Sequence, residues 1–72
     1  MEQSNHILVL DLWDVHNILV NVEDNSMSYA EAVEKQARAQ GVLVSDTKDV
    51  VLPVNHLYLK ENILEAITKL KP

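Results

Sequence analysis

Apolar residues in the first third of the chain fit two different periods. In "HILVLDLWDVHNILVNVED", one set spaced by three and four residues would form one face of a helix: Leu8, Leu12, Val15, Leu19 and Val22. The same segment is rich in isoleucine and valine, which lose side-chain freedom in helices and pack well in sheets. "WDVHN" supplies the aspartate and asparagine that turns favour. A helix in this segment would have no capping residue before it and no basic residue on its outer face. We therefore predict a β-hairpin with strands at Ile7–Leu12 and Ile18–Glu23.

The next segment, "NSMSYAEAVEKQARAQG", has the pattern of a helix with defined ends. Ser28 is followed three residues later by Glu31, which is the spacing of a capping box. Glu34 and Arg38 form a favourable acid-first pair four residues apart. Gly41 stands where a residue with left-handed backbone geometry would close the helix. We therefore predict a helix between Ser28 and Gly41.

Short apolar runs follow that helix. "VLV" and "VVLP" flank the turn-like "SDTKD", which predicts two short strands, and Pro53 ends the second because it has no N–H to give to a sheet. "HLYL" is a candidate for one more short strand. The closing segment "KENILEAITKLKP" places Ile63, Ile67 and Leu70 on one helical stripe, so it predicts a C-terminal helix.

The order of these elements predicts an α+β fold. We expect a β-hairpin, a helix, one or two short strands and a C-terminal helix (ββαββα-like), with a mostly antiparallel sheet and the helices packed on one face. An all-α bundle is the alternative, and it requires the first segment to be helical. At 72 residues the chain is expected to form one small domain, 1–72, in which residues 1–5 are flexible.

The charge is acidic and unevenly distributed. The net charge is −5, and no lysine or arginine occurs before Lys35. Such a surface disfavours contact with phosphate backbones, so we expect no direct nucleic-acid binding, and DNA mimicry would need carboxylates at phosphate-like spacing. The polar opening does not read as a secretory signal, and no apolar run approaches the roughly 20 residues of a membrane span. Because cysteine is absent, a reducing compartment is favoured, and we expect a cytoplasmic protein.

Residues that could carry chemistry gather in "LDLWDVHN". Asp14 and His16, with His6, are weak candidates for a metal site, since zinc and iron sites need imidazoles at close spacing. His56 is distant in sequence, and the calcium-loop pattern is missing. We therefore expect Asp11 and Asp14 to stabilise a turn, with no metal or other cofactor. A nucleophile elbow is lacking and the single glycine argues against a phosphate-cradling loop, so we do not predict an enzyme.

The remaining expectation is a binding role. Trp13 is expected to be buried, since the chain has only one tryptophan, two tyrosines and no phenylalanine, but if exposed it would be a contact residue. We predict a small acidic protein–protein interaction module of regulatory, inhibitor or adaptor type, such as an accessory protein of a phage or bacterial genome. A structural homodimer and a His/Asp metal-binding protein are the alternatives. The residues expected to carry the interaction are Trp13, Asp11, Asp14, Glu23, Asp24, Ile63 and Ile67.

Overall fold

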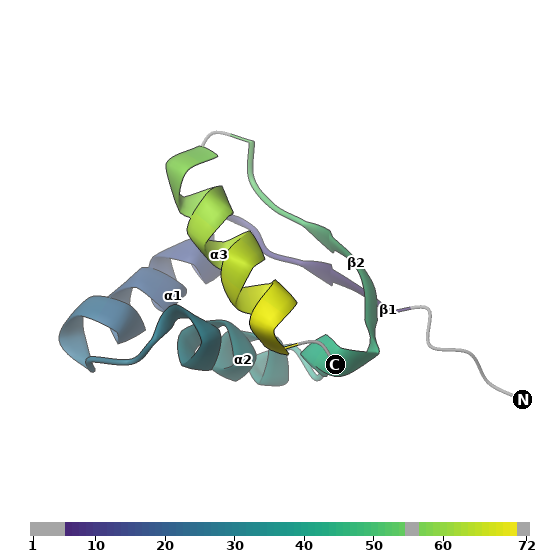
Figure 1. The fold of residues 1–72 in the computed structure, drawn as a ribbon, viewed down its shortest axis with the longest axis horizontal. Helices are drawn as coiled ribbons and strands as arrows, with labels where there is room; N and C mark the ends of the chain where they lie inside the picture. The colour runs from purple at the N-terminus through teal and green to yellow at the C-terminus, as the bar shows by residue number, and fades with distance from the viewer. Residues whose placement is uncertain (1–5, 55–56, 71–72) are drawn as a thin grey trace, which may run out of the picture.

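The computed structural model describes residues 6–54 and 57–70, which form two strands and three α-helices (Figure 1). In chain order the elements are β1 (His6–Val9), α1 (Leu12–Asp24), α2 (Tyr29–Ala39), the 3-10 turn η1 (Val44–Asp46), β2 (Thr47–Val51) and α3 (Leu57–Leu70). The strands pair in parallel, with Leu8 opposite Val50 and Val9 opposite Val51. A parallel pair needs a long crossover connection, and α1 with α2 supplies it.

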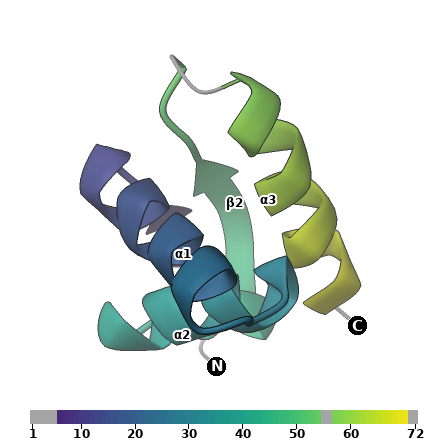
Figure 2. The same ribbon diagram turned by 90° about the vertical axis from the view of Figure 1, so that its left-hand side faces the viewer.

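The described residues form two layers, a two-stranded sheet and three helices that cover one of its faces (Figure 2). The core lies between these layers, where Leu8 and Leu10 from the β1 segment meet side chains from every helix. The fully or nearly fully buried apolar residues are Leu8, Leu10, Val15, Ile18, Ala32, Val33, Ala37, Val44, Ile63, Ala66 and Ile67. The small alanines on α2 and α3 let these helices lie close together and close to the sheet.

The predicted N-terminal hairpin is wrong, because its turn and its second strand form α1. Asp11 is the N-cap of this helix: its side chain accepts the Asp14 N–H at 2.9 Å, and the Asp14 carboxylate accepts the Asp11 N–H at 3.1 Å. This reciprocal capping starts the helix in the stretch assigned to a turn. Val15 and Ile18 then point into the core. Burial of this face outweighs the modest preference of isoleucine and valine for strands.

The predicted antiparallel sheet is also wrong, since β1 pairs in parallel with β2, about forty residues later. "VLV" forms no strand: Val44 begins η1, and the Thr47 hydroxyl donates to the Leu43 carbonyl at 3.0 Å to close that turn. β2 starts inside the predicted turn and stops before Pro53. "HLYL" is not a strand, because Leu57 starts α3. The all-α alternative is right for the first segment but wrong for the chain, which keeps a sheet.

The two remaining helix predictions are confirmed. The Ser28 hydroxyl accepts the Glu31 N–H at 3.1 Å, and Glu31 accepts the Ser28 N–H at 3.2 Å, which completes the capping box of α2. Gly41 follows α2 with a φ of 80°, the left-handed geometry that favours glycine. The C-terminal helix is present as α3 and begins earlier than its sequence pattern indicated. The prediction that residues 1–5 are flexible lies outside the described residues.

Candidate functional site

The candidate site is the outward face of α1, the side of this helix that points away from the core. Val15 and Ile18 occupy its buried side. Residues at helical spacing on the opposite side are Trp13, His16, Val20 and Asp24. The Trp13 side chain is 69% exposed, so the expectation that it is buried is wrong. The reason is the helix itself, since residue 13 lies across the helix axis from the core-facing positions.

The first turn of α1 presents an aromatic and aliphatic surface. The rings of Trp13 and His16 have centroids 5.8 Å apart with an interplanar angle of 30°, and both side chains are exposed. Leu12, beside them, is also more than half exposed. Exposed leucines are common on protein surfaces, but an exposed tryptophan is not, because it is the largest apolar side chain. This turn is therefore the part of α1 best suited to contact another molecule.

The other end of α1 carries two exposed carboxylates. Glu23 and Asp24 are exposed in its last turn, where no basic residue occurs. Carboxylates there add to the negative pole of the helix dipole, which disfavours them and favours a nearby cation. At 1.5 Å per residue, Asp24 lies about 16 Å from Trp13 along the helix axis. The face thus has an aromatic end and an acidic end.

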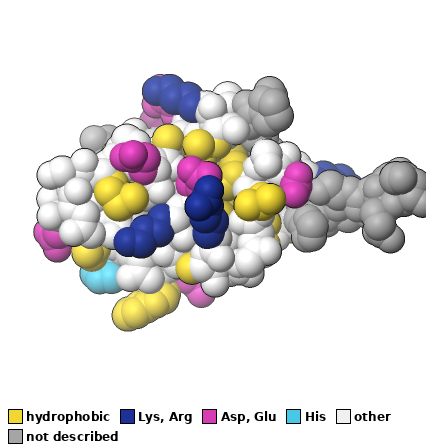
Figure 3. All heavy atoms as spheres, turned by 90° about the horizontal axis from the view of Figure 1, so that it is seen from below, with side chains coloured by type: hydrophobic (Ala, Val, Ile, Leu, Met, Phe, Trp, Pro, Cys, Tyr) yellow, Lys and Arg dark blue, Asp and Glu magenta, His cyan; other side chains and the backbone are white. Residues whose placement is uncertain are grey.

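Charges elsewhere on the helical layer are more balanced. On α2, the Arg38 guanidinium contacts the Glu34 carboxylate at 3.0 Å, and on α3 Lys69 lies 3.7 Å from Glu65. The space-filling view from below shows acidic and basic side chains interspersed with hydrophobic ones (Figure 3). The acidic bias of the chain is therefore strongest on α1, which contains no lysine or arginine.

Asp14 takes part in hydrogen bonds that connect α1, α2 and the end of β1. Its Oδ1 accepts a hydrogen bond from Gln36 Nε2 at 2.7 Å, and its Oδ2 accepts one from Gln40 Nε2 at 3.0 Å. Gln40 Nε2 also donates to the Val9 carbonyl at 3.1 Å, which links the end of β1 to α1 and α2. The sequence reasoning missed both glutamines, because nothing local marks a residue whose partner is more than twenty positions away. The Asp14 carboxylate therefore helps to hold α1, α2 and the end of β1 in place relative to one another.

Of the metal-site candidates, Asp14 and His16 are described with their side chains, and these two are not brought together. Asp14 and His16 are two residues apart on a helix, so they point to different sides of α1, and both Asp14 oxygens already accept hydrogen bonds. The side chain of His6 and all of His56 lie outside the described residues. Within the described part of the chain, no group of three or more histidine, aspartate or glutamate side chains could hold a metal ion.

The other residues predicted to interact include both exposed and buried side chains. Asp11 is exposed at the N-cap of α1. Ile63 and Ile67 are 1% and 3% exposed and belong to the core. A charged substitution at either isoleucine would therefore report on folding of the monomer and cannot test an interface. Val20 completes the outward face of α1, and helical spacing would have identified it had the helix been predicted.

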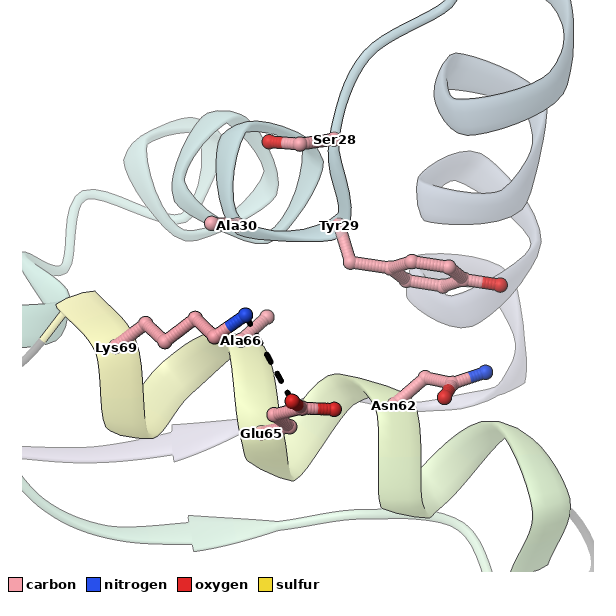
Figure 4. Close-up of a pocket in the computed structure, with 7 residues that line it drawn as sticks. All are labelled: Ser28, Tyr29, Ala30, Asn62, Glu65, Ala66 and Lys69. Carbon is pink, nitrogen blue, oxygen red and sulfur yellow. Dashed lines mark ion pairs between the residues drawn. The ribbon is translucent and has the colours of Figure 1, made fainter.

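A groove lies between α2 and α3 (Figure 4). It has a volume of about 310 Å³ and is lined by Ser28, Tyr29, Ala30, Asn62, Glu65, Ala66 and Lys69. The Tyr29 ring and the Asn62 side chain extend toward the same end of it, and the Glu65–Lys69 ion pair lies along it. The Ser28 hydroxyl is engaged in capping α2. The groove holds polar groups but no base positioned beside a nucleophile, so we do not assign it a reaction.

In the segments that the structure describes, none of the helices combines the length and apolar character needed to cross a bilayer. Comparison of the chain with protein-family models, with curated proteins and with solved structures gives no match.

Proposed function

We propose that this chain is a protein–protein interaction module of regulatory, adaptor or inhibitor type that binds a basic partner protein through the outward face of α1. The observation that carries the proposal is the 69% exposure of Trp13 on a helix whose other polar positions are neutral or acidic. Tryptophan is enriched among the residues that dominate binding energy at interfaces. An exposed indole contributes little to folding, but it is well suited to fill an apolar pocket on a partner.

The charge on α1 defines the chemistry of the partner. A lysine or arginine placed beside Glu23 and Asp24 would meet two carboxylates and the negative end of the helix dipole. A second cation could lie over the exposed face of the Trp13 indole. The complementary surface is therefore an apolar pocket with a basic group about 16 Å away, which is the distance between the two ends of the α1 face. In the same proposal the protein acts in the cytoplasm, in keeping with its cysteine-free composition.

The size of the Trp13 contribution can be derived from its exposed area. Burying most of an exposed indole removes on the order of 100 Å² from water. At about 25 cal/mol per Å² this contributes roughly 2–3 kcal/mol. Since 1.4 kcal/mol corresponds to a tenfold change in the dissociation constant, we expect Trp13→Ala to weaken the complex about 30- to 100-fold.

The test is a quantitative pull-down from lysate of the source organism with the tagged chain at low and moderate salt. We expect one host protein to be retained by the unaltered chain, released by rising salt and lost with Trp13→Ala. The pair of changes Glu23→Gln and Asp24→Asn should reduce retention at low salt. A matched control, Glu61→Gln with Glu65→Gln on α3, changes the net charge equally and should leave retention intact.

The single tryptophan provides a second readout for any partner recovered in this way. Burial of the exposed indole should shift its emission to shorter wavelength on titration with the purified partner. A partner that binds Trp13→Ala as tightly as the unaltered chain, or an emission spectrum that does not change, would overturn the assignment of α1 as the contact surface.

A further inference from the structure

The imidazole of His16 lies beside the Trp13 indole on the outward face of α1. The two ring centroids are 5.8 Å apart with an interplanar angle of 30°, and both side chains are exposed. Because the residues are three positions apart on one helix, the helix itself holds the rings on neighbouring turns. The aromatic end of the α1 face therefore contains a group of the kind that changes its charge near neutral pH.

The neighbours of His16 on α1 carry no charge. The residues one turn away on the same side are all apolar: Leu12, Trp13, Leu19 and Val20. The Asp14 carboxylate is directed toward α2, where it accepts hydrogen bonds from Gln36 and Gln40. The acidic end of the face begins at Glu23, about 10 Å further along the helix axis. A proton on His16 would therefore add a positive charge to an otherwise uncharged part of the helix.

The elements packed against α1 do not direct a charged side chain toward His16. α2 contacts α1 through the side that carries Gln36 and Gln40. The charged residues of α2 are at helical spacing on the opposite side of that helix: Glu31, Glu34, Lys35 and Arg38. The strands and α3 meet the buried side of α1, so the helix itself separates their charged groups from His16. Among the described residues, His16 forms no ion pair with a carboxylate.

We propose that His16 is a pH-sensitive switch for partner binding at the α1 face. The neutral imidazole leaves the indole of Trp13 accessible to a basic group, whereas the imidazolium repels that group. Since an imidazolium is also attracted to an indole face, it competes with the partner's cation for the same ring. The inference rests on the proposed function for the charge of the partner, and it adds that binding weakens as the pH falls.

The separation of the rings sets the size of the effect. Protonation places a positive charge 5.8 Å from the centre of the indole against which the partner's cation would lie. At an effective dielectric constant of about 40–80, repulsion between two positive charges at this separation weakens binding roughly 3- to 10-fold. Aspartate and glutamate ordinarily titrate about two pH units below histidine, so a change from pH 7.5 to pH 5.8 acts mainly on histidine.

The charge beside Trp13 can be measured in the full chain without a partner, because collisional quenching of its emission depends on the charge of the quencher. At constant ionic strength, we expect the quenching rate constant of Cs⁺ to fall about two- to threefold between pH 7.5 and pH 5.8, and that of iodide to rise by a similar factor. Acrylamide is neutral, so its rate constant should change little. The single tryptophan assigns the whole signal to residue 13.

Substitutions identify the group that titrates. His16→Gln should give the same Cs⁺ rate constant at both pH values, whereas His6→Gln, which removes a different imidazole, should keep the pH dependence. Circular dichroism at both pH values checks the fold, and His16→Phe, which keeps a ring without a titrating group, provides the same comparison if His16→Gln is less stable. A Cs⁺ rate constant that does not change with pH in the unaltered chain, or that changes equally in His16→Gln and His16→Phe, overturns the proposal.

A partner recovered through the α1 face extends the test to binding. It should bind the unaltered chain about 3- to 10-fold less tightly at pH 5.8 than at pH 7.5, and should bind His16→Gln equally at both. A pH-dependent Cs⁺ rate constant with no partner for Trp13 would remove the proposed function and leave the charge change beside the indole established. A partner that is lost with Trp13→Ala but binds equally at both pH values would keep the proposed function and overturn the present inference.

Discussion

Removing the Asp14 carboxylate is expected to destabilise the fold more than removing other surface carboxylates. Its oxygens accept hydrogen bonds from Gln36 at 2.7 Å, from Gln40 at 3.0 Å and from the Asp11 N–H at 3.1 Å. Hydrogen bonds to a charged acceptor contribute about 1.5–3 kcal/mol each when well shielded. Because Asp14 is only partly buried and two of the bonds are exposed, we reduce their sum to about 2–3 kcal/mol for Asp14→Ala.

That loss is large for a chain of this length. At about 0.05–0.15 kcal/mol per residue, the total free energy of unfolding is about 4–11 kcal/mol. A change of 1 kcal/mol moves the midpoint of thermal unfolding by about 4–8 °C in a domain of this size, so Asp14→Ala should lower it by roughly 10–20 °C. Urea unfolding followed by circular dichroism gives the free energy directly.

Two further variants test the source of the loss. Asp14→Asn keeps the shape and removes the charge, so it should lose about half as much. A double-mutant cycle of Asp14→Ala with Gln36→Ala should give a coupling energy of about 1 kcal/mol. Glu61→Ala is the control, since this exposed glutamate on α3 should change stability by less than about 0.5 kcal/mol. The reasoning is refuted if Asp14→Ala loses no more than the control, or if the cycle shows no coupling.

Three other predictions follow from single positions. Ser26 has a φ of 55° in the corner between α1 and α2, so Ser26→Gly should relieve backbone strain and raise the unfolding midpoint by a few degrees; a lower midpoint would contradict this. Ile63→Ala should lose about 2–4 kcal/mol in urea unfolding, because this residue is buried between the layers, whereas Leu64→Ala on the exposed side of α3 should lose less than 1 kcal/mol. Acrylamide should quench the emission of Trp13 in the free protein nearly as well as that of free tryptophan, and protection from quenching would indicate that the indole is covered.

The parts of the fold that sequence could predict are those fixed by neighbours in the chain. The helix from Tyr29 to Ala39 can be predicted from Ser28 and Glu31 at its start and from Gly41 after its end. Each of these residues acts on backbone groups within four positions, so its meaning does not depend on the rest of the molecule. The C-terminal helix was recognisable from its apolar stripe in the same way.

The hairpin predicted for the first segment is wrong because two local signals compete there and the deciding one is less familiar. Asp11 and Asp14 form a capping box in which aspartate replaces the usual glutamate at the third helical position, and aspartates in this stretch also fit a turn. The prediction that Trp13 is buried is wrong for the same reason. A hairpin turn would direct residue 13 differently from α1, which points it away from the core. The parallel pairing of β1 with β2 could not be read from the sequence, because nothing near Val9 specifies Val51 as its neighbour.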